Sequence, residues 1–221
     1  MLSSLAPCAF GLGALAVAMG RATQQGAIAA RITTRADQQY PWYVRLIFAL
    51  QRRRYGTELE PARLWGRAPR VFLALTLLYR ALERKSSPVE PALRSLVIVN
   101  VSRINWCAYC VDLNSATAIE RHVPAAKLEA LGDFERSALF SEREKAALAY
   151  AELITFSDRD VDDASMSRLK AQFDDDAIIE LTALVGFQNL SSKFNAALGV
   201  APQGFCPNVQ LPRSDVKVPT L

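Results

Sequence analysis

The amino-acid sequence predicts an all-α protein, and three observations point to this fold class. Apolar residues recur at helical spacing in most segments, and proline, glycine and capping residues separate these segments. No segment alternates apolar and polar residues as a half-buried strand does. Hydrophobic residues make up 51% of the 221 residues, which allows a sizeable core within one domain.

An N-terminal helical layer is predicted over about residues 40–85. Its first helix covers residues 40–55, follows a turn at Pro41 and ends at Gly56. Its second helix contains the strongly apolar residues 71–79, which we expect to be buried.

Two helices are predicted in the middle of the chain. The first has Pro91 in its first turn, where proline is favoured, and continues to about Arg103. Residues 96–99 alone would also suit a strand, so the prediction of a helix here depends partly on the residues on either side. The second covers about residues 106–122, with Asn105 as its expected N-terminal cap.

Four more helices are predicted before residue 200. Each begins at a residue or pattern that favours a helix N-terminus: Pro124, the capping box of residues 141–144, Asp162 with Asp163, and residues 174–176. The last helix, residues 177–198, is the longest, and Gly199 suits its C-terminal cap.

The predicted domain organisation has three parts: an extension over residues 1–38, a single all-α domain over residues 39–205, and an irregular tail over residues 206–221. Residues 5–19 are apolar, but no basic residue precedes Arg21, as it would in an export signal, and the run is shorter than the ~20 residues that span a bilayer. We therefore expect a loose extension, a cytoplasmic protein and no stable membrane insertion, with export as the alternative.

The charge of the chain is modest overall but unevenly distributed. Residues 1–90 contain 13 Lys and Arg and 5 Asp and Glu, a net charge of +8, whereas residues 91–221 contain 13 and 17, a net charge of −4. This pattern favours two layers, or two subunits, that attract each other. Nucleic-acid binding is not expected, because no dense basic face with aromatic or zinc modules is present.

The most distinctive motif is Cys107-Ala108-Tyr109-Cys110, at the predicted start of a helix. The partial positive charge of a helix N-terminus favours a thiolate, and Cys107, Cys110 and Asn114 would share one helix face. A redox-active pair, a zinc site and two inert buried cysteines are all compatible with this spacing. Zinc needs two further ligands, and the remaining candidates, listed here, are scattered along the chain: Cys8, Cys206 and His122.

Two segments of the chain resemble a known family. Residues 93–117, which contain Ser-Arg-Ile-Asn-Trp-Cys-Ala-Tyr-Cys, and residues 187–199, which contain Phe-Asn-Ala-Ala-Leu-Gly, are similar to the carboxymuconolactone decarboxylase and alkylhydroperoxidase D-type family. The likeness covers about residues 70–205. It implies an all-α fold and a homo-oligomer, with hydroperoxide as substrate and an external dithiol as reductant. By this resemblance Cys110 attacks the peroxide and Cys107 closes the disulfide.

The sequence departs from the peroxidase members at three positions of their proton relay. Ser95 and Asn114 replace a Glu and a His, and Tyr109 replaces a second His that some members carry between the cysteines. Such a relay contributes roughly 10²–10⁴-fold in rate, so its loss would slow thiolate attack without abolishing it.

Four residues remain as possible support for the cysteines. Ser95 and Asn114 can hold a water or hydrogen-bond a thiolate or peroxide oxygen, although neither is a general base at neutral pH. Tyr109 offers a hydroxyl but suits packing better, and Trp106 suits the wall of a pocket.

Two titratable residues near the motif are expected to serve elsewhere. His122 lies about 18 Å along the helix from Cys110, which suggests a role at the helix end. Asp112 points about 160° away from Cys110 around the helix.

The leading functional hypothesis is a thiol-dependent peroxidase or disulfide oxidoreductase that needs no cofactor or metal. It requires one of the two sulfurs to be open to solvent or substrate. The alternative is a catalytically quiet family member that acts as a ligand-binding or assembly module. Lactone decarboxylation is the less favoured activity, because the matching Glu and His are absent.

Overall fold

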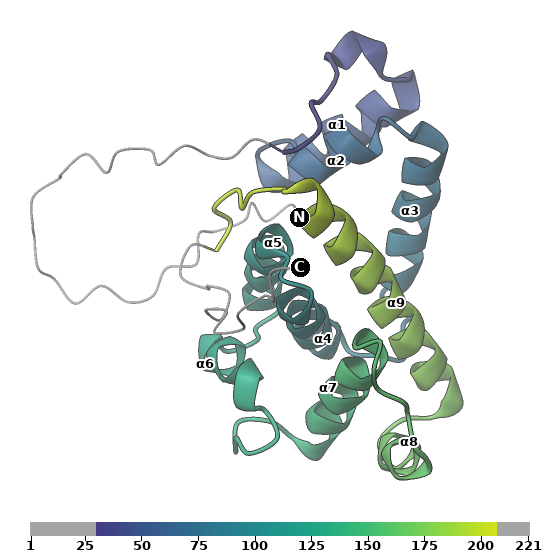
Figure 1. Cartoon of the computed structure of the whole chain (residues 1–221), viewed down its shortest axis with the longest axis vertical. Coiled ribbons are helices and arrows are strands. Elements are labelled where there is room, and N and C mark those ends of the chain that lie inside the picture. The colour runs from purple at the N-terminus through teal and green to yellow at the C-terminus, as the bar shows by residue number, and fades with distance from the viewer. Residues whose placement is uncertain (1–29, 207–221) are drawn as a thin grey trace, which may run out of the picture.

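The computed structural model describes residues 30–206, and within this range every regular element is a helix (Figure 1). The elements are η1 (Asp37–Gln39), α1 (Trp42–Tyr55), α2 (Glu60–Trp65), α3 (Pro69–Leu82), α4 (Pro91–Ile104), α5 (Ala108–Glu120), α6 (Ala125–Glu129), η2 (Ala130–Asp133), α7 (Glu142–Thr155), α8 (Asp163–Lys170) and α9 (Asp175–Leu198). The predicted all-α class is confirmed. Cys8, most of the predicted extension and most of the predicted tail lie outside the described residues.

Helix α4 is the centre of the molecule. It contacts α5, α7 and α9, and all ten residues from Leu93 to Ser102 are buried. A helix that is covered on every side does not need a polar face, which explains the unbroken apolar run of residues 96–99. Residues 96–99 are therefore helical, and the strand that they also suit does not form.

One large apolar cluster joins α4, α7 and α9 with the ends of neighbouring helices. Leu96, Val99, Leu148 and Leu181 are among its most buried members. Burying such a side chain stabilises the fold by about 1.5–3 kcal/mol, so this cluster sets the relative positions of the three helices.

The N-terminal layer consists of α1, α2 and α3, and Figure 1 shows α3 beside the long helix α9. A second cluster, which includes Tyr40, Val44, Phe48 and Phe72, holds the layer together. The expected burial of residues 71–79 is wrong: α3 contacts its neighbours along one side only, and Phe72 alone of these residues is buried.

Most helix ends follow the predicted caps, but α5 and α2 differ from the prediction. Ser141 and Glu144 form the expected capping box, and Gly199 adopts a left-handed conformation with φ of 68° after α9. The helix predicted over residues 106–122 is shorter, and Asn105 follows the end of α4 and does not cap the N-terminus of α5. The six-residue helix α2 is absent from the prediction. No helix within residues 30–206 is long and apolar enough to cross a bilayer.

Candidate dithiol site

The position of the cysteines is set by the way α4 ends. The N–H of Trp106 donates to the carbonyl of Arg103 and the N–H of Cys107 donates to the carbonyl of Ser102, both at 3.1 Å. This pair of bonds is a Schellman motif, and it places Trp106 in the left-handed region with φ of 54°. Cys107 thereby leaves α4 and becomes the N-cap of α5, where its Sγ accepts from the N–H of Cys110 at 3.2 Å.

Cys107 and Cys110 are joined by a disulfide, with their Cα atoms 5.2 Å apart. The pair is therefore in the oxidised form, and within residues 30–206 no three side chains gather as a metal site would require. Both residues are buried, at 1% and 3% exposure, in a cluster that includes Leu64 and Val200. The hypothesis requires one sulfur to be open to solvent or substrate, and in this oxidised form neither sulfur is open to solvent. Cys206 is buried as well and is not a free thiol.

Asn195 of α9 contacts the second cysteine directly. Its Nδ2 donates to Cys110 Sγ at 3.3 Å, and the residue is 2% exposed. Its Oδ1 is buried without a hydrogen-bond partner. A Schellman motif at the end of α9, in which the N–H of Val200 donates to the carbonyl of Asn195 at 3.0 Å, fixes the backbone here.

A buried polar network continues from this point between α4, α5 and α9. Ser102 Oγ accepts from Gln188 Nε2 at 3.0 Å and from Asn114 Nδ2 at 3.1 Å. Gln188 Nε2 also donates to Ser192 Oγ at 2.8 Å. Asn114 thus hydrogen-bonds to a serine of α4, and the network lines the interior between the disulfide helix and α9.

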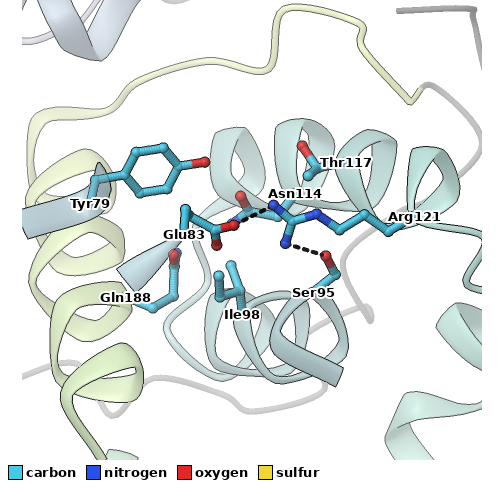
Figure 2. Close-up of a pocket in the computed structure, with 8 residues that line it drawn as sticks. All are labelled: Tyr79, Glu83, Ser95, Ile98, Asn114, Thr117, Arg121 and Gln188. Carbon is cyan, nitrogen blue, oxygen red and sulfur yellow. Dashed lines mark hydrogen bonds and ion pairs between the residues drawn. The ribbon is translucent and has the colours of Figure 1, made fainter. Parts of the chain in front are cut away.

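A small cavity lies along the same face of α5, one turn beyond Cys110 (Figure 2). Its volume is about 20 Å³, enough for one water molecule. The lining residues are Tyr79, Glu83, Ser95, Ile98, Asn114, Thr117, Arg121 and Gln188. Asn114, Thr117 and Arg121 follow Cys110 at intervals of four, three and four residues, so all four occupy one stripe of the helix. The cavity brings together the predicted Ser95 and Asn114.

Arg121 connects two lining residues of this cavity. One Nη donates to Ser95 Oγ at 3.1 Å and the other forms an ion pair with Glu83, as Figure 2 shows. Arg94 lies 3.7 Å from the same Glu83 oxygen, and burial lowers the pKa of Arg94 more than Glu83 raises it. The carboxylate absent at position 95 is therefore present nearby, supplied by Glu83 just after α3. It is held by two guanidinium groups.

A larger, apolar cavity of about 220 Å³ lies on another side of the cysteine cluster. It is lined by Ile32, Leu64, Trp65, Arg67, Ala68, Phe194 and Leu198. The rings of Trp65 and Phe194 stack at 3.6 Å and form a flat wall. Leu64, Phe194 and Leu198 also pack in the cluster that contains both cysteines, so the cavity and the disulfide border the same apolar cluster.

The remaining predicted residues occupy other positions. Tyr109 is buried with its hydroxyl unpartnered, and burial raises the pKa of that hydroxyl well above its ordinary value. Trp106 is half-exposed and lines neither cavity, which does not support its expected role as a pocket wall. His122 ends α5 in a left-handed conformation with φ of 63°. Asp112 accepts hydrogen bonds from the backbone N–H groups of residues 203, 204 and 206.

Sequence reasoning missed Asn195, Gln188, Glu83 and Arg121. Gln188, Ser192 and Asn195 follow one another at helical spacing on a buried face of α9, and this polar stripe was a signal that could have been used. Glu83 and Arg121 carry no such signal, because the two residues are 38 positions apart in sequence and only the tertiary fold brings them together.

Fold and site together define an all-helical protein with a Cys-x-x-Cys disulfide at a helix start. Residues 69–153 match the model of the carboxymuconolactone decarboxylase family. The chain is 45% identical over 157 residues to the YnjA protein of Escherichia coli (strain K12), a match that covers 71% of this chain and 86% of YnjA. The chain belongs to the carboxymuconolactone decarboxylase family.

Solved structures support the fold. A peroxidase-related protein of Ralstonia eutropha JMP134, described as an alkylhydroperoxidase AhpD core, superposes with a TM-score of 0.72 at 21% identity, over 80% of this chain and 94% of that one. The debrominase Bmp8 superposes with a TM-score of 0.69 at 20% identity, over 81% and 94% of the two chains. At these identities the likeness concerns the fold alone.

Proposed function

We propose that this protein is a thiol-dependent peroxidase that reduces hydroperoxides through Cys107 and Cys110. The observation that carries the proposal is the disulfide between the two cysteines, together with the amide hydrogen bond to Cys110 Sγ. Membership of a family whose fold also occurs in peroxidase-related proteins supports it.

The proposed cycle begins with both cysteines reduced. The Cys110 thiolate attacks the terminal oxygen of the hydroperoxide, the O–O bond breaks, and the departing alkoxide takes a proton to leave as an alcohol. The thiol of Cys107 then attacks the sulfenic sulfur of Cys110, which forms the disulfide and releases water. An external dithiol reduces the disulfide by two successive exchange steps and is itself oxidised.

The apolar cavity favours an organic hydroperoxide. Apart from Arg67, its walls are aliphatic and aromatic side chains, and three of them also pack in the cluster that contains the cysteines. An alkyl or aryl group there would gain from burial, whereas hydrogen peroxide would not. The proposal therefore expects a higher kcat/KM for cumene hydroperoxide than for hydrogen peroxide.

Peroxide consumption with dithiothreitol as reductant tests the proposed function. We expect the wild-type protein to turn over hydroperoxide and Cys110→Ser to lose turnover. Cys107→Ser should retain one oxidation of Cys110 per molecule without forming the internal disulfide. Equal steady-state rates for wild type and Cys110→Ser would reject the proposal.

The burial of both sulfurs favours the second candidate, a quiet member that acts as a ligand-binding or assembly module. In that case the disulfide is structural. The two candidates differ in a simple measurement: the fully reduced protein is mixed with an equimolar hydroperoxide and its free thiols are counted. Loss of two thiols within minutes supports the peroxidase, and unchanged thiols support the module.

We also propose that the protein self-associates through the outer face of α3. Four apolar residues are 40–58% exposed along this helix: Val71, Leu73, Leu77 and Leu78. The net charges of +8 on residues 1–90 and −4 on residues 91–221 favour a second copy as the occupant. Sedimentation of wild type and Leu77→Asp provides the test: we expect the variant to be the smaller species, and a monomeric wild type would contradict the proposal.

A further inference from the structure

We propose that Asn195 is a catalytic residue of this site, with a separate task for each end of its side-chain amide. The amide nitrogen stabilises the thiolate of Cys110, and the amide oxygen accepts the O–H of the hydroperoxide. The first task concerns Cys110 alone. The second rests on the proposed function.

The first task follows from the contact between Asn195 and the sulfur. Asn195 Nδ2 donates to Cys110 Sγ at 3.3 Å, and among residues 30–206 no other side-chain N–H group is hydrogen-bonded to that atom. A disulfide sulfur is a weak acceptor, whereas a thiolate carries a full negative charge and accepts a charge-assisted bond that is about twice as strong. The bond therefore favours the ionised, reduced form of Cys110 over both the thiol and the disulfide.

The charged groups near the cysteines do not offer the same stabilisation. Burial is the main cause of the raised pKa of the neighbouring Tyr109, and the charges of Asp112 on α5 and Glu60 on α2 raise it further, so the field from these carboxylates opposes a further negative charge. Arg121 lies three turns from Cys110 along α5 and is paired with Glu83. Within residues 30–206, Asn195 is therefore the side-chain donor that is hydrogen-bonded to this position, in addition to the N-terminal end of α5.

The second task follows from the other end of the amide. Because the nitrogen faces the sulfur, Oδ1 is fixed as a buried acceptor, and it has no partner. A buried polar atom of this kind is usually satisfied, so its exceptions call for an explanation. A hydroperoxide that approaches Cys110 carries an O–H donor, and binding that donor at Oδ1 would place its terminal oxygen beside Sγ.

The surroundings of Asn195 hold the amide in place. The residue is 2% exposed, its carbonyl is in the Schellman motif of α9, and its neighbour Phe194 stacks on Trp65. Phe194 also lines the apolar cavity, so the organic part of a substrate in that cavity would contact the residue that directly precedes Asn195. A rigid donor and acceptor of this kind need little reorganisation during reaction.

The experiment measures the ionisation of Cys110 in a Cys107→Ser background, where it is the reactive thiol of the site. The rate of alkylation by iodoacetamide is recorded against pH for the parent, Asn195→Leu and Asn195→Asp. We expect the acid dissociation constant of Cys110 to fall about tenfold in Asn195→Leu, because a charge-assisted hydrogen bond is lost. Asn195→Asp, which places a carboxylate beside the sulfur, should lower it further.

Ser192→Ala is the matched control, since Ser192 is equally buried one turn earlier on α9 and bonds to Gln188 instead of the sulfur. Its alkylation profile should match that of the parent. If Asn195→Leu also matches the parent, the thiolate role is overturned. Circular dichroism of each variant shows that the fold is retained, and Asn195→Asp remains informative if Asn195→Leu does not fold.

The oxygen's role is tested by single-turnover oxidation of Cys110 with cumene hydroperoxide, at a pH where the thiol is fully ionised in both proteins. If Asn195→Leu is still oxidised about tenfold more slowly than the parent under these conditions, the acceptor role is supported; equal oxidation rates overturn it. Failure of the proposed function gives a different result. If the protein does not react with peroxide but Asn195→Leu still shifts the alkylation profile, the thiolate role of Asn195 is supported and the peroxidase proposal is rejected.

Discussion

The N–H of Cys107 donates to the carbonyl oxygen of Ser102 at 3.1 Å, so the residue that completes the end of α4 also begins α5. The left-handed Trp106 between them lets the chain turn within three residues. The same motif ends α5, where His122 takes the left-handed position and the N–H of Val123 donates to the carbonyl of Ala118. Two non-glycine residues thus occupy backbone positions that glycine would adopt without strain.

His122→Gly should stabilise the protein by about 0.5–1 kcal/mol, because glycine removes the strain at a position where the imidazole is exposed. Because His122 lies beyond the end of α5 and outside the dithiol site, we expect peroxide turnover to be unchanged. Urea unfolding and the turnover assay provide the two readouts. Trp106→Gly is the comparison: it relieves the same strain but loses the half-buried indole, so we expect a smaller gain or none.

Leu64→Ala should accelerate reduction of the Cys107–Cys110 disulfide by dithiothreitol. Leu64 lines the apolar cavity and packs in the cysteine cluster, so truncation opens a path between them. We also expect a loss of about 2–4 kcal/mol in unfolding free energy. Leu148→Ala, in the main core away from the cysteines, should destabilise comparably. Equal acceleration by both variants would mean that reduction requires global unfolding rather than local access.

Glu83→Gln should destabilise the protein by about 2–4 kcal/mol, since it leaves Arg121 and Arg94 without their shared carboxylate in a partly buried position. The double variant Glu83→Gln with Arg121→Met should recover part of this loss. Chemical denaturation of all four members of the cycle gives the coupling energy. The exposed pair Glu135–Arg168 offers the control, and Glu135→Gln should cost less than about 1 kcal/mol.

Glu144 should make the stability depend on pH. Burial acts to raise the pKa of Glu144, but hydrogen bonds from Lys127 and Ser141 outweigh it and lower the pKa below the ordinary 4.5. Because the folded-state pKa is depressed, this stabilisation is complete well above pH 4.5 and is lost as the pH falls. Glu144→Gln should therefore cost about 1 kcal/mol at pH 7 and progressively less below pH 4.5. Glu142→Gln, in the same helix turn but largely exposed, is the control: it keeps Glu144 and should therefore keep the pH dependence of the wild type in thermal denaturation.

Local patterns predicted most of the helices and the position of both cysteines at the start of a helix. Pro91, the capping box at Ser141 and the glycine at 199 mark helix ends through contacts within a few residues, and the Cys-x-x-Cys spacing is local as well. The helix α2 was missed because six residues carry too little periodicity.

The rest of the site depends on tertiary packing. Asn195 is 85 residues from Cys110 in sequence, and Glu83 is 38 residues from Arg121. The exposure of α3 also escaped prediction, since an apolar helix looks the same in sequence whether it is covered within its own chain or not. Composition and periodicity report which faces are apolar, and they do not report which side chains from distant helices meet.

The ion pair between Glu83 and Arg121 ties the outer layer to the helix that carries the cysteines. A minimal version of the domain, cut to start near Pro91, would retain both arginines and discard their counter-ion. Anyone who designs such a truncation, or grafts this Cys-x-x-Cys helix into a related scaffold, should replace Arg121 with an apolar residue or transplant a carboxylate with it.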